Sequence, residues 1–329
     1  MLLSVDGGAT KTIAILVDEE NTTVEGVGVS GPASLISVPI DLAGQNIMKA
    51  INDALYDAHI HLSEVNDAVF GLSGIGDSKE LDKNGTQLIY RLTSREDFRV
   101  VNDGLPAFTL AHLNKDGIIF AGGTGSVAYY KINGSTRRVG GWNWFVGDDG
   151  SASWIAKRAL NLATLEYDDI YPEKRIVKEA EKYFGMEFRE AIAFLDRHQD
   201  KRIISGFAPY VSSLAISGYL PAIKILEESA EYIASILITI SKKYSIKPRI
   251  SLIGGTMQAG SFYTDLIFNK LKMKGSVFYG YHVAIGGIIL MLLDKHDLNE
   301  SMRDNLINQM NAFLRKKGKS YWGDFIMVD

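Results

Sequence analysis

The stretch LLSVDGGATKT at residues 2–12 decides the fold that we predict for this chain. An apolar strand leads into an aspartate, two glycines and a Thr-Lys-Thr sequence, and a second apolar strand follows at residues 13–18. The pattern predicts a β-hairpin with a phosphate-sized tip, because glycines let backbone N–H groups approach an anion without a Cβ in the way. An ordinary tight hairpin fits the same residues, since turns favour Gly and strands favour Thr. The remaining sequence has to separate these two interpretations.

Several side chains at this tip are of the kinds that bind phosphate or a metal ion. The candidate phosphate ligands are Gly7, Gly8, Thr10, Lys11 and Thr12. Asp6 ends the first strand, and a carboxylate there can hold Mg²⁺ through water, because Mg²⁺ prefers oxygen ligands and keeps part of its hydration shell. Lys11 fits a solvated hairpin lysine equally well, so its residue type leaves its role open.

Composition excludes several classes of protein. The chain has 329 residues, of which 46% are hydrophobic, and this length predicts two domains with a well-filled core. A net charge of −4 without a long basic run argues against nucleic acid as a partner. The absence of cysteine excludes disulfides, cysteine-ligated zinc, iron–sulfur clusters and a cysteine nucleophile. The longest apolar run, residues 283–293, is too short to span a bilayer, and no signal-peptide pattern opens the chain. We therefore expect a cytoplasmic protein without a membrane partner.

The first third of the chain has the pattern of a mixed α/β domain. The expected order is βββαβαβ, with three strands in 2–30, a helix at 41–58, a strand at 67–74, a helix at 79–92 and a strand at 98–104. Such an order predicts a mixed sheet with helices packed on it, and ligands of such sheets bind at the carboxyl ends of strands. Asp6, Gly74 and Asp103 fall at such ends.

The same plan starts again near residue 105. Residues 117–130 repeat the order of apolar strand, glycine and threonine turn, and apolar strand. The elements expected after it are a strand around 138–141, helices between 153 and 243, strands at 249–257 and 277–279, and helices at 284–293 and 299–318. We predict domains at 1–105 and 106–329, with the final helix free to pack back on the first domain.

Three glycine turns, each after a predicted strand, favour a nucleotide over an ordinary hairpin. The first would grip one end of a triphosphate, and the second, at Gly122–Ser126, would grip it from the other half of the chain. The third, at Gly254–Met257, would lie near the base, where glycines allow a flat ring to lie against the backbone.

The chain resembles the actin/Hsp70/sugar-kinase ATPase superfamily, and within it the N-acetylglucosamine kinase and BadF/BadG/BcrA/BcrD-type group. The motifs that carry the resemblance are DGGATKT at 6–12, GLSG at 71–74, ND at 102–103, AGGTGS at 121–126, GGW at 140–142, GDDGSA at 147–152 and GG at 254–255. They run in the family's order from residue 5 to about 290, and the block from 140 to 152 is the most specific. The resemblance implies two ribonuclease-H-like α/β domains, each a mixed five-stranded sheet flanked by helices, with a cleft between them. It also implies ATP and Mg²⁺ as cofactors and a sugar as the phosphoryl acceptor.

The resemblance assigns roles to individual residues. Asp103 matches the catalytic aspartate, which orients the sugar hydroxyl and takes its proton; the other interpretation of Asp103 is a cap of the helix that starts near Pro106. The nucleotide would contact residues of the later turns, namely Gly123, Thr124, Gly125, Ser126, Gly254, Gly255, Thr256 and Met257.

The expected sugar contacts come from several motifs. They are Ser34, Gly74, Asn102, Asp103, Gly141, Trp142, Asp148 and Ala152. Trp142 could equally be a core aromatic residue. N-acetylglucosamine kinases tend to carry Asn where this chain has Ser34, and Asp149 replaces the family's more usual Glu. The acceptor therefore stays open among a hexose, an amino sugar and a sugar acid such as 2-keto-3-deoxygluconate.

Other functions of related folds fit less well. An activator of an acyl-CoA dehydratase holds an iron–sulfur cluster with cysteines, which this chain lacks. A chaperone ATPase would need a substrate domain after the nucleotide domain, and a sugar-responsive repressor would need a DNA-binding segment before it, so we expect neither. A non-catalytic nucleotide or sugar sensor stays open. We expect a homodimer whose domains close on the sugar.

Overall fold

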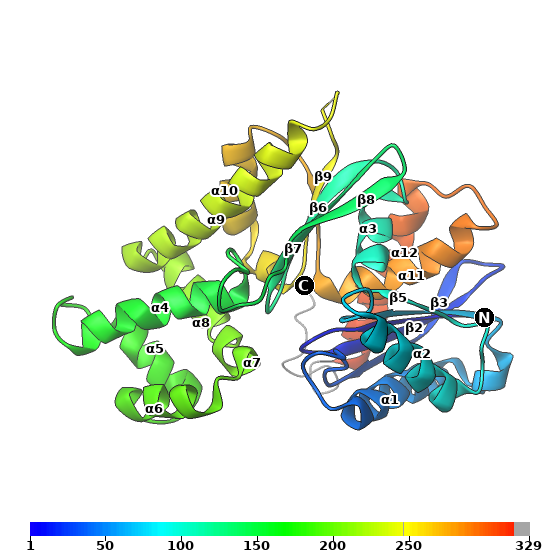
Figure 1. The fold of residues 1–329 in the computed structure, drawn as a ribbon, viewed down its shortest axis with the longest axis horizontal. Helices are drawn as coiled ribbons and strands as arrows, with labels where there is room; N and C mark the ends of the chain where they lie inside the picture. The colour runs from blue at the N-terminus through cyan, green and yellow to red at the C-terminus, as the bar shows by residue number, and fades with distance from the viewer. Residues whose placement is uncertain (246, 319–329) are drawn as a thin grey trace. The chain divides into compact units, whose positions relative to one another are not determined.

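The structure is a computed structural model that describes residues 1–245 and 247–318 (Figure 1). Its contacts divide the chain into two compact units. The first unit consists of Met1–Lys115 together with residues 280–318, and the second is Asp116–Tyr279.

The sheet of the first unit is built around the strand that opens the chain. Its strands are β1 (Leu2–Gly7), β2 (Thr12–Asp18), β3 (Thr23–Ser30), β4 (Asp67–Leu72) and β5 (Arg99–Asn102). Their order across the sheet is β3-β2-β1-β4-β5. Strand β2 is antiparallel to both β1 and β3, whereas β4 and β5 run parallel to β1, so the carboxyl ends of β1, β4 and β5 share one edge.

In the part of the chain that the structure describes, five α-helices cover this sheet. They are α1 (Ile40–Ala58), α2 (Lys79–Thr93), α3 (Gly104–His112), α11 (Val283–Leu293) and α12 (Glu300–Lys317). Helix α1 packs so closely on β3 that a Cβ at Gly28 would come within 1.8 Å of the Ala50 carbonyl oxygen. Helix α11 lies on β1 and β4, where Gly287 faces Ser4. Helix α12 packs on β3, whose Val24 N–H donates to the Gln309 side chain.

The second unit repeats the sheet of the first. Its strands are β6 (Gly117–Gly122), β7 (Ser126–Ile132), β8 (Ser135–Gly140), β9 (Ile250–Ile253) and β10 (Ser276–Phe278). Read from β8, the order β8-β7-β6-β9-β10 matches the first sheet's β3-β2-β1-β4-β5, with β6 in the place of β1. Strand β7 is antiparallel to both β6 and β8, as β2 is to β1 and β3. Strands β9 and β10 are parallel to β6.

Helices make up most of the second unit outside its sheet. They are α4 (Ala152–Tyr167), α5 (Arg175–Phe184), α6 (Phe188–His198), α7 (Lys201–Ser205), α8 (Ala208–Ile216), α9 (Leu220–Ser241) and α10 (Ser261–Leu271). Figure 1 shows α4 to α8 as a helical group on one side of α9. One core of buried residues joins α4, α8 and α9 to strands β6 and β9.

The predicted fold class is confirmed: both units are α/β, and each has a mixed five-stranded sheet flanked by helices. The domain boundary expected after residue 105 falls inside α3, which instead packs on α11 and belongs to the first unit. The chain also returns to the first unit at Gly280, because Gly286 lets α11 lie against the backbone of Pro106. Residues 319–329 of the second expected domain lie outside the described residues.

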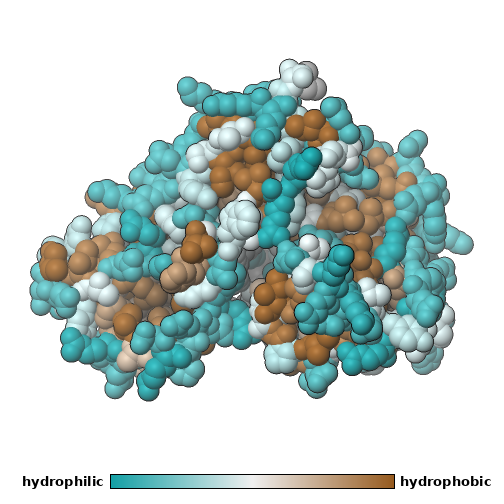
Figure 2. Space-filling view, in the orientation of Figure 1, coloured by the Kyte–Doolittle hydropathy of each residue, from teal (hydrophilic) through white to brown (hydrophobic). Residues whose placement is uncertain are grey.

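No single helix in residues 1–245 and 247–318 is both long and apolar enough to cross a membrane. One pair of segments, Lys201–Ile216 and Leu220–Ser241, meets the length and composition criteria only when counted together, and it is bent by 116°. On the face shown in Figure 2, hydrophobic residues occur in separate patches among hydrophilic ones.

Candidate functional site

The loops at the carboxyl edge of the first sheet are joined by backbone hydrogen bonds. The N–H groups of Ala33 and Ser34 both donate to the Gly8 carbonyl oxygen, at 3.0 and 3.1 Å. Ser73 N–H donates to the Gly7 carbonyl oxygen at 3.1 Å, and its own carbonyl oxygen accepts from Leu35 N–H at 3.0 Å. Three loops, after β1, β3 and β4, therefore meet beside the first glycine turn.

The two glycines of this turn serve different purposes. A Cβ at Gly7 would come within 2.6 Å of a Leu72 methyl group, so this glycine permits close packing of β1 on its neighbours. Gly8 N–H donates to the Lys11 carbonyl oxygen at 3.0 Å and closes the turn. Thr10 is exposed at the tip, whereas Thr12 is fully buried and its hydroxyl donates to the Gly31 carbonyl oxygen at 2.7 Å. The structure thus gives Thr12 an internal role that ties β2 to the end of β3.

At this edge Asp6 interacts electrostatically with Lys11 of its own turn and with Asp103, which follows β5. Asp6 is only 8% exposed, and burial raises the pKa of its carboxyl group to about 8, with the negative charge of Asp103 as the second cause. Burial also lowers the pKa of the Lys11 ammonium group to about 8, against the opposing attraction of Asp6. Lys11 is partly buried in the turn, and Asp6, Lys11 and Asp103 form one electrostatic cluster centred on Asp6.

This cluster suits a divalent cation. Lys11 only partly offsets the burial of the Asp6 carboxylate, whose pKa stays raised, and a bound cation would add positive charge there. Within the described residues no three His, Cys, Asp or Glu side chains gather at metal-ligand distance. Mg²⁺ at Asp6 would therefore complete its coordination with water and phosphate oxygens, which is its common habit in phosphoryl-transfer sites.

Asn102, not Asp103, caps the helix that follows β5. The side-chain oxygen of Asn102 accepts from Gly104 N–H at 2.9 Å, and its amide NH₂ donates to the Ile75 carbonyl oxygen at 2.6 Å. The Asp103 side chain forms no capping hydrogen bond with α3. The helix-cap interpretation of Asp103 is therefore wrong, and Asn102 positions both α3 and the loop after β4.

Two expected sugar contacts lie in the loops of the first unit. Ser34 is 1% exposed, and its hydroxyl forms a hydrogen bond with the Ser37 hydroxyl at 3.2 Å. Gly74 has a φ of +108° and leaves room for Ile36, whose Cγ1 would lie 3.0 Å from a Cβ there. Both residues are thus placed beside the first glycine turn.

The second and third glycine turns are in direct contact in the second unit. The Thr256 hydroxyl donates to the Gly122 carbonyl oxygen at 2.9 Å, and Gly254, with a φ of +119°, packs against the same carbonyl group. A Cβ at Gly123 or Gly255 would meet no atom within 4 Å, so both glycines present backbone to open space. Met257 is 1% exposed and belongs to the core.

The loop after β8 lies against the second turn. The Ser126 hydroxyl donates to the Asp149 carbonyl oxygen at 2.8 Å, and Ala152 N–H donates to the Gly123 carbonyl oxygen at 2.9 Å. Asp148 is 6% exposed, and one of its carboxylate oxygens would lie 2.5 Å from a Cβ at Gly125. Turn 122–126 and loop 147–152 therefore form one structural group, which also contains Thr124.

The structure adds a lysine that our sequence reasoning missed. The Lys201 ammonium group lies 3.3 Å from the Asp148 carboxylate, and it would lie 3.1 Å from a Cβ at Gly125. Lys201 opens α7 in a helical region without a motif, 53 residues from Asp148. No spacing or composition signal marks it; only the folded chain brings it to the turn.

Trp142 is not a core residue, because it is 77% exposed. Phe145 and Val146 in the same loop are also exposed. The neighbouring Gly141 has a φ of +71°, and its carbonyl oxygen accepts from the Arg138 guanidinium group at 2.5 Å. The loop thus presents an aromatic side chain to its surroundings rather than to the core.

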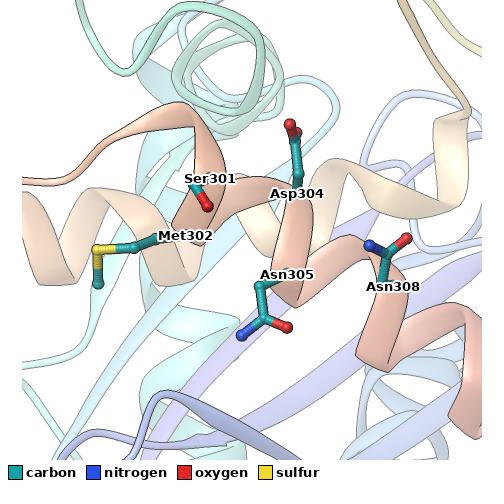
Figure 3. Close-up of a pocket in the computed structure, with 5 residues that line it drawn as sticks. All are labelled: Ser301, Met302, Asp304, Asn305 and Asn308. Carbon is teal, nitrogen blue, oxygen red and sulfur yellow. The ribbon is translucent and has the colours of Figure 1, made fainter.

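A polar hollow elsewhere in the first unit is not this site. It has a volume of about 610 Å³ and is lined by residues of α12, namely Ser301, Met302, Asp304, Asn305 and Asn308 (Figure 3). These side chains project from one helix in different directions, and none of the predicted site residues is among them. We assign no part of the proposed chemistry to it.

Comparisons with known proteins identify the family of this chain. The model of the BadF/BadG/BcrA/BcrD ATPase family matches residues 3–290. The glucosamine kinase of Vibrio cholerae is 25% identical over 253 residues, which cover 77% of this chain and 83% of that protein. The N-acetylmuramic acid/N-acetylglucosamine kinase of Clostridium acetobutylicum is 26% identical over 240 residues, which cover 70% and 75%. The crystal structure of a candidate N-acetylglucosamine kinase from Chromobacterium violaceum shares the fold, with a TM-score of 0.70 and 23% identity over 89% of this chain and 98% of that one.

Proposed function

Because the chain belongs to the BadF/BadG/BcrA/BcrD ATPase family, we propose that it is an ATP-dependent kinase that phosphorylates a hydroxyl group of an amino sugar. The observation that carries the proposal is the cluster of Asp6, Lys11 and Asp103 at the carboxyl edge of the first sheet. It combines a carboxylate suited to a metal ion, a cation suited to phosphate, and a second carboxylate that does not cap its helix.

In the first unit, we assign Asp103 to the sugar hydroxyl. Its carboxylate would accept a hydrogen bond from the hydroxyl, orient the oxygen for in-line attack, and take the proton as the bond to phosphorus forms. Asp6 would hold Mg²⁺ through water, and Thr10 and Lys11 would contact the phosphates. Bound Mg²⁺ would neutralise charge on the phosphates. Asn102 would keep Asp103 in place through its two hydrogen bonds.

In the second unit, we assign the open backbone at Gly123 and Gly255 to the nucleotide. The supporting observation is the empty space over both Cα atoms, which a side chain would fill. Thr124, Gly125 and Ser126 would contribute further phosphate contacts. We assign Gly141, Trp142, Asp148 and Ala152 to the sugar, as we do Ser34 and Gly74 in the first unit.

An amino sugar is the acceptor that the relatives support best. The proteins of Vibrio cholerae and Clostridium acetobutylicum are named as kinases of glucosamine, N-acetylmuramic acid and N-acetylglucosamine. Ser34 is short and already bonded to Ser37, so it offers less to an N-acetyl group than an amide side chain would. We therefore propose that glucosamine is preferred over its N-acetylated form.

A coupled assay of ADP release over a panel of sugars tests this function. The panel contains glucosamine, N-acetylglucosamine, N-acetylmuramic acid, glucose and 2-keto-3-deoxygluconate. We expect the highest kcat/KM with glucosamine. A higher value with glucose or with 2-keto-3-deoxygluconate would overturn the amino-sugar assignment. ADP release that no sugar stimulates would overturn the kinase and favour a nucleotide sensor.

A further inference from the structure

The second glycine turn has an electrostatic problem if it binds phosphate. A carboxylate oxygen of Asp148 lies against Gly125, at 2.5 Å from the position of a Cβ there. The Asp148 side chain is only 4% exposed, so water screens its charge poorly. A buried carboxylate beside an anion-binding turn repels the anion, because like charges at short range in a protein raise each other's energy.

Lys201 lies where it can remove this repulsion. Its ammonium group is 3.3 Å from the Asp148 carboxylate and also reaches the face of Gly125. The Lys201 side chain is 28% exposed, so a ligand that approaches the turn can reach it. Asp200, its neighbour in sequence, does not compete for it in the same way, because that carboxylate pairs with Arg202 at 2.7 Å.

We propose, on the premise of the kinase function above, that Lys201 is the charge-compensating cation of the second glycine turn. It pairs with Asp148 on one side and faces the bound phosphate chain of ATP on the other. Asp148 can then accept hydrogen bonds from sugar hydroxyls while its charge is offset. Lys201 is thus a nucleotide-binding residue that also offsets the negative charge of Asp148 beside the phosphates.

Nucleotide binding to a set of four variants tests this role by calorimetry. The variants are Lys201→Gln, Lys201→Arg, Asp148→Asn and the double variant Lys201→Gln/Asp148→Asn, with Lys178→Gln as the control at an exposed lysine of the same unit. A non-hydrolysable ATP analogue with Mg²⁺ is the ligand, and AMP is the ligand with fewer phosphates. Thermal unfolding of each variant reports whether the fold is kept.

We expect Lys201→Gln to raise the Kd of the ATP analogue about tenfold and the Kd of AMP much less, since fewer phosphate charges are left uncompensated. Lys201→Arg and Lys178→Gln should bind like the wild type. Asp148→Asn should bind at least as tightly as the wild type, and the double variant should recover most of the affinity lost in Lys201→Gln, because the repelling carboxylate is gone.

The proposal is overturned if Lys201→Gln binds the ATP analogue like the wild type. It is overturned as well if this variant raises the Kd of the analogue and the Kd of AMP by the same factor. It is also overturned if the double variant stays as weak as Lys201→Gln, since Lys201 would then act without compensating Asp148. Wild-type protein that binds no nucleotide would overturn the kinase function itself, and this inference with it. Normal nucleotide binding and sugar phosphorylation in Lys201→Gln would overturn the inference alone.

Discussion

Gly254 packs so closely on Gly122 that a Cβ at residue 254 would lie 2.1 Å from the Gly122 carbonyl oxygen. The positive φ of Gly254 adds to this requirement, because side-chain-bearing residues rarely adopt it. The contact joins the second and third glycine turns, which lie more than a hundred residues apart in sequence. The close approach of the two turns thus requires a residue without a side chain at position 254.

Substitution of this glycine should therefore destabilise the protein. We expect Gly254→Ala to lower the free energy of unfolding by about 3 kcal/mol, through overpacking and backbone strain together. Gly255→Ala is the matched control, since its Cβ would meet no atom within 4 Å. Chemical denaturation of both variants measures the difference. Equal stability of the two variants would contradict the close contact.

The control variant also reports on ligand binding. We assign the open space over Gly255 to the nucleotide, and the methyl group of an alanine at this position would occupy part of that space. Gly255→Ala should keep its stability and raise the Kd for ATP by about tenfold. Unchanged nucleotide affinity would remove Gly255 from the nucleotide site.

The raised pKa of Asp6 predicts how stability depends on pH. Burial raises this pKa from 3.8 to about 8, so between these pH values the folded state binds the proton more tightly than the unfolded state does. The free energy of unfolding of the ligand-free protein should therefore fall as pH rises through this window. Asp6→Asn removes the group, so its stability relative to the wild type should increase with pH.

Denaturant titrations of both proteins at several pH values below 8 measure this effect. That limit keeps Lys11 out of the comparison, because its lowered pKa of about 8 acts in the opposite direction above that pH. Asp41→Asn on the exposed start of α1 is the control for the loss of one carboxylate. Parallel curves for wild type and Asp6→Asn would show that Asp6 is not a buried group with a raised pKa.

Because Trp142 is exposed, its substitution can test sugar binding without lowering the stability of the protein. At 77% exposed it contributes little to the core, so Trp142→Ala should leave the unfolding temperature unchanged. If it borders the sugar, as we propose, the same variant should raise KM for the sugar about tenfold with a smaller effect on KM for ATP. Phe145→Ala, at a position 75% exposed in the same loop, should change neither KM. Equal effects of both variants would point to the loop as a whole rather than to Trp142.

Much of the fold could be predicted because it follows from local patterns. The hairpin at residues 2–18, the order of the following elements and the repeat near residue 117 all depend on strand and turn preferences that are visible in the sequence. The return of α11 to the first unit could not be predicted from such patterns. Its apolar residues would suit either sheet, and the choice depends on the close fit of Gly286 and Gly287 against Pro106 and Ser4.

The candidate site, too, could be predicted from the sequence only in part. Asp6 and Asp103 could be proposed from their places at strand ends, and the structure makes them act on each other electrostatically. Side chains with several possible partners could not be assigned from sequence. The Thr12 hydroxyl and the Asn102 amide both make internal hydrogen bonds, and Lys201 reaches its turn only through the packing of the second unit.

The most direct test of the kinase account is a comparison of wild type with Asp103→Asn by phosphorus NMR. With ATP, Mg²⁺ and glucosamine, wild type should form a sugar phosphate and ADP in equal amounts. Asp103→Asn should bind ATP normally and form the sugar phosphate about a thousandfold more slowly, because the carboxylate that takes the proton is missing. Asp41→Asn should match the wild type. Near-normal sugar phosphate formation by Asp103→Asn, or ADP formation by wild type without any sugar phosphate, would contradict the account.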